Sequence, residues 1–152
     1  MHGPVKIAKT RLIRCALLLA LCSTQAIAAD FTIAPNISGG FGNYHWDIAI
    51  GSAAVAANPE LTLLTGQTYT FQVNTIAIHP FWIKTAPSTG SLNAYAGGGL
   101  SANGVGAATT VTFVVPNNAP ATLYYDCGNH FEMHGTINVI VDAVFKDNFE
   151  GP

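Results

Sequence analysis

The sequence predicts an all-β protein in which short antiparallel strands form a two-sheet sandwich. Apolar and polar residues alternate with a period of two along several short segments, and turn-forming residues separate those segments. No stretch of the chain shows a sustained helical period. About 124 of the 152 residues remain after the N-terminal leader described below, which is enough for one domain with a hydrophobic core.

The expected strands follow from this alternation and from the turns between them. Tyr69, Phe71 and Val73, for example, alternate with polar neighbours, and Gly66 and the segment 116–120 supply turns. The stretch 86–108, rich in Gly, Ser, Asn and Ala, is a long connection of the kind that carries a chain between two sheets. We expect strands at residues 31–34, 44–50, 61–64, 68–74, 78–84, 110–115, 121–127 and 136–141.

The N-terminus has the pattern of a cleaved signal peptide. A basic segment precedes an unbroken apolar run at residues 15–22, and Ala26-Ile27-Ala28 matches the small-x-small cleavage pattern. The apolar run is far shorter than the roughly 20 residues that a membrane-spanning helix needs, so we expect no stable membrane anchor. We therefore interpret residues 1–28 as a signal peptide, 29–142 as the domain and 143–152 as a short tail. The basic residues of the leader are Lys6, Lys9, Arg11 and Arg14.

Export changes the charge and the cysteine content of the chain. The mature protein keeps two basic residues against eight acidic ones, a net charge of −6, which excludes a nucleic-acid-binding protein. Such a charge favours a basic partner protein, or it serves solubility alone. Only Cys127 remains of three cysteines, so no disulfide within the chain is possible. In a periplasmic or secreted protein this thiol is protected by burial, by an intermolecular bridge or by a metal.

The residues around Cys127 favour a metal. His130 follows it at +3 and Met133 at +6, and a second imidazole, His79, lies upstream. Two imidazoles and a thiolate in a trigonal plane, with a weak axial thioether, are the donor set of a copper site for electron transfer. Each of these residues alone has an ordinary alternative, as a core side chain or a turn residue.

The period of the preceding strand predicts where the thiol points. Cys127 shares a face with Tyr125 and Leu123, so it faces the core at the end of a strand, and the following turn directs His130 and Met133 onto the same metal. His134 is one residue out of phase with that turn, so we expect it to be exposed and Met133 to be the axial ligand. We interpret His45 as an ordinary strand residue.

Four segments resemble the blue copper proteins, the cupredoxins of the plastocyanin, amicyanin and pseudoazurin group. They are residues 58–63, 66–71, 79–81 and 123–135, and the similarity extends over roughly residues 30 to 142. The Cys-x-x-His-x-x-Met spacing is similar to the ligand loop of amicyanin. The resemblance implies a seven- or eight-stranded Greek-key sandwich whose activity is electron transfer. It also implies one type 1 copper ion, with the ligands His79, Cys127, His130 and Met133.

One position departs from that family. Many members have Asn or Ser after the first histidine ligand, where a backbone N–H commonly donates to the cysteine sulfur, whereas this chain has Pro80, which lacks an N–H. The loss of that bond predicts a lower reduction potential.

Three functions remain open. The leading one is an exported, monomeric electron carrier that meets other redox proteins and exchanges electrons through the edge of His130. The alternatives are a copper-sequestering module without redox turnover and a metal-free binding domain. We do not expect an enzyme, because copper oxidases and nitrite reductases need further copper centres and several domains.

Overall fold

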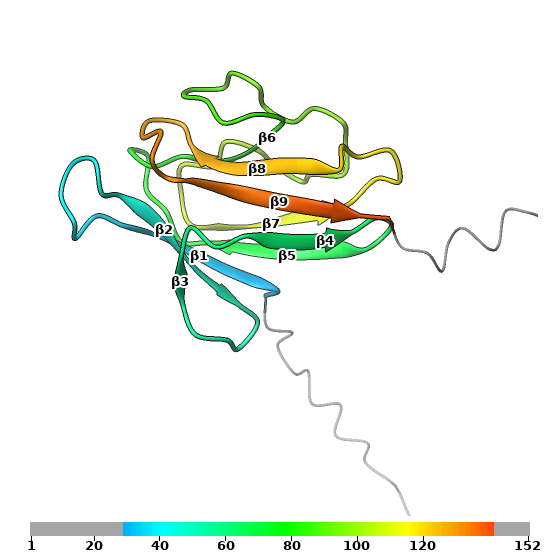
Figure 1. Cartoon of the computed structure of the whole chain (residues 1–152), viewed down its shortest axis with the longest axis horizontal. Coiled ribbons are helices and arrows are strands. Elements are labelled where there is room, and N and C mark those ends of the chain that lie inside the picture. The colour runs from blue at the N-terminus through cyan, green and yellow to red at the C-terminus, as the bar shows by residue number, and fades with distance from the viewer. Residues whose placement is uncertain (1–28, 142–152) are drawn as a thin grey trace, which may run out of the picture.

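The computed structural model describes residues 29–141, whose strands form two sheets packed face to face (Figure 1). One sheet has the order β3-β2-β1-β5-β7 and the other the order β4-β9-β8-β6. The expected signal peptide and C-terminal tail lie outside the described residues. The strands are β1 (Phe31–Asn36), β2 (His45–Ile50), β3 (Ala56–Ala57), β4 (Leu61–Leu64), β5 (Thr68–Val73), β6 (Phe81–Lys84), β7 (Thr109–Val114), β8 (Thr122–Cys127) and β9 (His134–Ile140).

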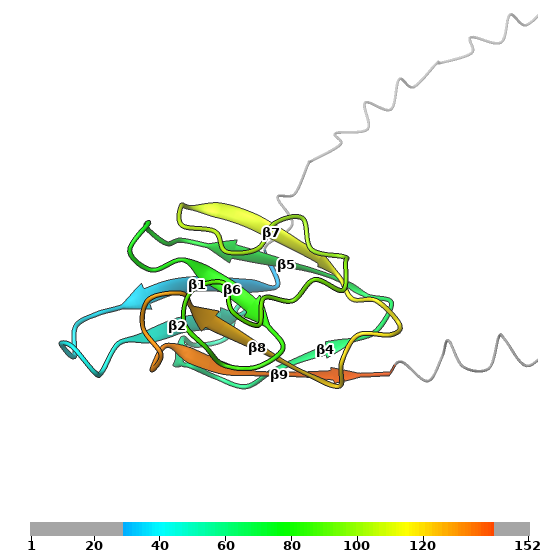
Figure 2. The ribbon, with the colours of Figure 1, turned by 90° about the horizontal axis from the view of Figure 1, so that it is seen from above.

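The core lies between the two layers, which Figure 2 shows from above. Alternate residues of most strands point inward, as the period of two predicts, and bury their apolar side chains against the opposite sheet, whereas both residues of β3 are exposed. Aromatic rings fill much of this space: Phe81 packs against Trp46, Phe71 and Tyr125. The expected all-β sandwich with two sheets is confirmed, and no helix among the described residues is long and apolar enough to cross a membrane.

The sandwich is not wholly antiparallel, which corrects the expectation from the sequence. β1 pairs with β5 in parallel, and so does β4 with β9. Consecutive strands from β3 to β8 alternate between the two sheets, so the neighbours in these pairs are joined by crossovers. A tight hairpin forces antiparallel pairing, whereas a crossover permits either direction, and strand periodicity does not distinguish them.

Several strand boundaries also differ from the sequence prediction. Ile78, His79 and Pro80 were expected in a strand but lie in a turn before β6, where the His79 N–H donates to the Ile76 carbonyl. β9 begins at His134, two residues earlier than expected, and the short strand β3 was not anticipated. The turn matters for the site, because the direction of the His79 side chain is then not set by the inward–outward alternation of β6.

The long connection between β6 and β7 carries the chain from one sheet to the other, as expected, and also covers β6 and β8. Its residues Val105 and Ala94 form isolated bridges with Phe81 and Lys84 of β6. Beneath it, Lys84 and Asp126 are completely buried although they lie on the outer side of their strands. The connection therefore buries part of the outer face of β6 and β8, whereas Trp82 and Tyr124 on that face stay half-buried.

Candidate metal centre

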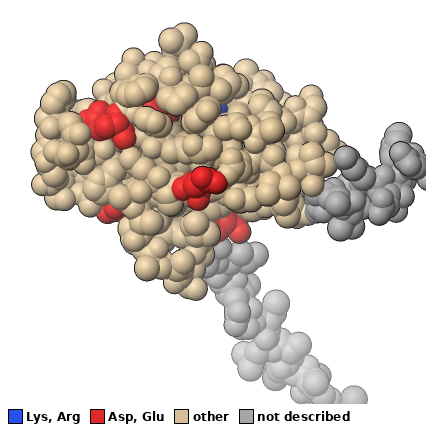
Figure 3. Space-filling view, in the orientation of Figure 1, with Lys and Arg blue, Asp and Glu red and all other residues tan. Residues whose placement is uncertain are grey.

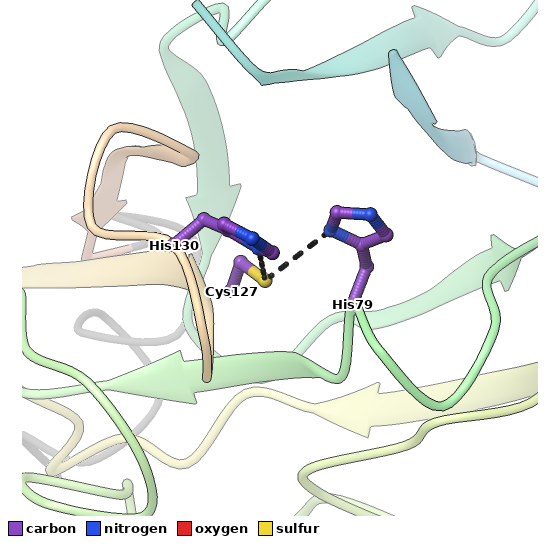
Figure 4. A group of neighbouring side chains, drawn as sticks. All are labelled: His79, Cys127 and His130. Atoms are coloured by element: carbon purple, nitrogen blue, oxygen red, sulfur yellow. Dashed lines mark hydrogen bonds between the residues drawn. The ribbon is translucent and has the colours of Figure 1, made fainter. Parts of the chain in front are cut away.

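Three of the four predicted ligands lie together at one end of the sandwich. The Sγ atom of Cys127 is 3.9 Å from Nδ1 of His79 and 3.6 Å from Nδ1 of His130, and the side chains point toward one another (Figure 4). Cys127 and His79 are buried and His130 is half-buried. Within residues 29–141, no other group of three or more His, Cys, Asp or Glu residues lies close enough to hold a metal ion.

Strand pairing brings these residues together. Cys127 is the last residue of β8 and lies opposite Phe81, the first residue of β6, so the turn that carries His79 lies beside the loop that follows Cys127. The Thr75 hydroxyl donates to the His79 carbonyl at 2.5 Å and closes that turn. Cys127 faces the core with Tyr125 and Leu123, as the strand period predicted.

The loop after β8 is a compact turn that returns to its own start. The Met133 N–H donates to the His130 carbonyl at 3.1 Å, and the Cys127 N–H donates to the Met133 carbonyl at 2.9 Å. These bonds hold Met133 beside Cys127, and its side chain is completely buried. A sequence spacing of three therefore becomes a spatial cluster.

Hydrogen bonds brace this loop from neighbouring segments. The Gly128 N–H donates to the Pro80 carbonyl at 2.9 Å, and the Asn129 side chain donates to the Ile78 carbonyl at 2.8 Å, so the two histidine-bearing segments are joined directly. The Asn58 side chain donates to the Glu132 carbonyl at 3.0 Å. The backbone segments that carry the donors are thus held by the protein's own hydrogen bonds.

The separations of the donors fit a single ion. With metal–sulfur and metal–nitrogen bonds of about 2.3 and 2.0 Å at an angle of about 120°, the donor atoms would lie about 3.7 Å apart. The two Sγ–Nδ1 distances, 3.6 and 3.9 Å, lie on either side of that value. One thiolate and two imidazoles in this arrangement favour copper.

Burial shifts the pKa of His79 and the pKa of Cys127 in opposite directions. Burial, together with the nearby His130 ring, lowers the pKa of His79, which favours the neutral imidazole that binds metals. Burial raises the pKa of Cys127, and the nearby Asp126 and Glu132 carboxylates add to this effect. Without metal the thiol therefore keeps its proton, and metal binding would release it.

Backbone N–H groups of the ligand loop act on the sulfur in the opposite direction. Hydrogen bonds from the Asn129 and His130 N–H groups lower the pKa of Cys127. Pro80 has no N–H to add to these bonds. The sulfur nevertheless has two backbone donors, both from its own loop. The lower potential expected from Pro80 stays a prediction.

The other two histidines of residues 29–141 lie outside the group. His45 opens β2 as a strand residue, as expected, and its Nε2 lies 3.2 Å from Oδ1 of Asp47. His134 opens β9, where it is half-buried rather than exposed, and its Nδ1 lies 2.5 Å from the Phe131 carbonyl oxygen.

Sequence reasoning missed Tyr44, whose ring contacts both imidazoles. Its centroid lies 5.9 Å from that of His79 and 5.1 Å from that of His130, with nearly perpendicular planes in both pairs. Tyr44 belongs to the loop between β1 and β2, in the opposite sheet, and no spacing pattern relates it to the ligands. Only the folded topology brings it to the site.

Comparisons with known proteins give distant structural similarity. A mutant of rusticyanin has a TM-score of 0.46 at 17% identity, over 72% of this chain and 76% of that one. A reduced mutant of amicyanin scores 0.36 at 19% identity, over 73% of this chain and 99% of that one. A variant of the multicopper oxidase McoA from the hyperthermophile Aquifex aeolicus scores 0.40 at 16% identity, over 80% of this chain and 28% of that one.

No protein-family model matches this chain, and no curated protein matches its sequence. At so low a similarity, the functions of these three proteins give no information about the function of this chain.

Proposed function

We propose that this protein carries single electrons on one type 1 copper ion held by His79, Cys127, His130 and Met133. The observation that carries the proposal is the cluster of one thiol and two imidazole nitrogens at metal-binding separations. Copper is the metal that this donor set serves best, and it supplies one-electron chemistry between Cu(I) and Cu(II). Met133 is the proposed axial donor, because its carbonyl accepts a hydrogen bond from the Cys127 N–H and its side chain is buried.

The site suits electron transfer better than copper storage. Soft sulfur donors stabilise Cu(I), while imidazoles keep Cu(II) accessible, so a mixed donor set holds both states. Storage of Cu(I) would be better served by several sulfur donors, whereas residues 29–141 contain one Cys and one Met. The bonds from Asn129 and Asn58 brace the ligand loop, which limits how far the donors move when the copper changes oxidation state.

The surface charge supports a basic redox partner. Lys84 is the one Lys or Arg within residues 29–141, and it is buried, whereas Asp30 and Glu60 are exposed. Figure 3 shows acidic side chains spread over one face with almost no basic surface between them. Attraction of this face to basic proteins would raise association rates at low ionic strength. We place the protein in the periplasm or outside the cell on the basis of its N-terminal pattern, and we propose that it acts there as a monomer.

Voltammetry of the copper-loaded protein tests the proposal. A carrier gives a reversible one-electron wave over repeated cycles and keeps its copper in the presence of a modest concentration of a Cu(I) chelator. The zinc-loaded protein should give no wave, which assigns the signal to copper. An irreversible wave, or release of copper on reduction, contradicts the carrier function and favours copper sequestration.

A further inference from the structure

The two imidazoles of the cluster lack one kind of support that histidine ligands usually have. A metal-binding histidine normally donates its second ring N–H to a carboxylate, a carbonyl or water, and a protein partner fixes the ring. Here Nδ1 of each ring faces Cys127, and Nε2 of His79 and of His130 has no hydrogen-bond partner among the described residues. Within residues 29–141, no hydrogen bond from the protein to Nε2 therefore fixes these rings.

The Tyr44 ring is placed to do so. It packs nearly perpendicular to both imidazoles, at interplanar angles of 85° with His79 and 78° with His130. The ring centroids of the two imidazoles lie 4.6 Å apart, and their planes are tilted by only 32° from each other, so one ring can support both. Edge-to-face contacts of this kind stabilise aromatic pairs beyond the area that they bury.

The loop that carries Tyr44 has its own conformation and does not depend on the metal. The Asn43 N–H donates to the Gly40 carbonyl and its side chain to the Gly39 carbonyl. Gly40 has a positive φ of 74°, which favours glycine. Two residues after Tyr44, Trp46 is completely buried in the core. The ring is therefore anchored to the five-stranded sheet, opposite the sheet that supplies Cys127.

We propose that Tyr44 is a positioning residue that holds both imidazoles in their metal-binding orientation before the metal arrives. The proposal rests on the proposed copper site. The ring, and not the hydroxyl, makes the contacts, so Phe should replace Tyr44 without loss. Pre-orientation of ligands removes part of the ordering cost from binding, so loss of the ring should weaken metal affinity.

Metal-free protein tests the contacts first. In the NMR spectrum of the wild type, the ring current of Tyr44 should shift the carbon-bound ring protons of both His79 and His130. These shifts should persist in Tyr44→Phe and disappear in Tyr44→Leu. Phe41→Leu is the matched control, because Phe41 contacts Tyr44 edge-on and is 86% exposed, and it should change neither set of shifts. Unchanged histidine shifts in Tyr44→Leu overturn the proposal.

Copper affinity tests the consequence. In competition with a chelator, Tyr44→Leu should bind Cu(II) about tenfold more weakly, because two aromatic contacts are lost, whereas Tyr44→Phe should stay within about twofold of the wild type. Equal affinity of Tyr44→Leu and wild type overturns the positioning role while leaving the copper site intact. A wild type that binds no Cu(II) instead refutes the proposed function, and the two failures are thereby distinguished.

Discussion

Cys127 and Asp126 are neighbours at the end of β8, yet they belong to buried polar clusters of opposite character. On the inner face, Cys127 meets two imidazole nitrogens, and the three groups lie close enough together to hold a metal ion. On the outer face, Oδ2 of Asp126 accepts the Ser88 N–H at 2.9 Å and lies 3.5 Å from Nζ of Lys84. That ammonium also donates to the Ser88 carbonyl at 2.6 Å.

The difference separates a structural cluster from a binding one. Burial of polar groups is unfavourable unless they are paired. Nζ of Lys84 and Oδ2 of Asp126 find partners inside the protein, whereas Oδ1 of Asp126 has none among the described residues. Burial raises the pKa of Asp126, and the Ser88 N–H and Lys84 oppose that rise. The imidazole and thiol donors form no ion pair: their nitrogens face the sulfur, which also accepts two backbone N–H groups of its own loop, so these donors are available to an ion. We therefore expect changes in the first cluster to alter stability, and changes in the second to alter metal chemistry.

Removal of Lys84 should have the largest effect on stability. Lys84→Met leaves the Asp126 carboxylate buried without its cation, which should lower the free energy of unfolding of the metal-free protein by about 3–5 kcal/mol. Chemical denaturation measures this loss. Folded protein below the transition should still take up copper, because Lys84 does not contact the ligands.

The double variant Lys84→Met/Asp126→Leu sharpens this result. It removes both charges, so it should recover most of the stability that the single variant loses, since buried ion pairs are often replaceable by apolar residues. A double variant as unstable as Lys84→Met would show that the pair has a role other than mutual neutralisation.

Asn58 should have an intermediate effect, because it joins the ligand loop to the opposite sheet. Its side chain accepts the Trp46 N–H at 2.8 Å and donates to the Glu132 carbonyl, which ties the five-stranded sheet to the ligand loop. Loss of both bonds in Asn58→Gly should cost about 2 kcal/mol of unfolding free energy and slow electron self-exchange. Gly tolerates the positive φ of 42° at this position, so backbone strain does not contribute. Wild-type stability and exchange in Asn58→Gly would show that the tie is dispensable.

Met133 should have the smallest effect on stability and a clear effect on the metal. Met133→Leu nearly conserves volume, so it should cost less than about 1.5 kcal/mol. As the proposed axial ligand, its replacement should nevertheless shift both the reduction potential and the visible spectrum. His134→Ala should leave both nearly unchanged. If His134→Ala shifts them and Met133→Leu does not, the axial assignment is wrong.

The sequence was sufficient to predict the candidate metal ligands around Cys127, because their chemistry is unusual and their spacing is short. One cysteine with a histidine at +3, a methionine at +6 and a second histidine upstream favours a metal before the fold is known, and the period of β8 predicted that Cys127 faces inward. The burial of Asp126 and Lys84 was not predictable in this way, because it depends on the connection after β6 folding over the outer face. The ring contacts of Tyr44 and the hydrogen bonds of Asn58 likewise join segments from opposite sheets. The crossovers that connect the parallel strand pairs also pass between the sheets. Strand periodicity carries no information about such partners.

A titration of the metal-free protein with Cu(II), followed by visible absorption, tests the central claim most directly. Thiolate coordination in a trigonal site predicts an intense sulfur-to-copper charge-transfer band toward the red end of the visible, which saturates at one copper per protein. Cys127→Ser should abolish the band even if some copper still binds, while Lys84→Met should keep it. A wild-type protein that stays colourless with Cu(II) would contradict the type 1 copper site and favour the metal-free binding domain.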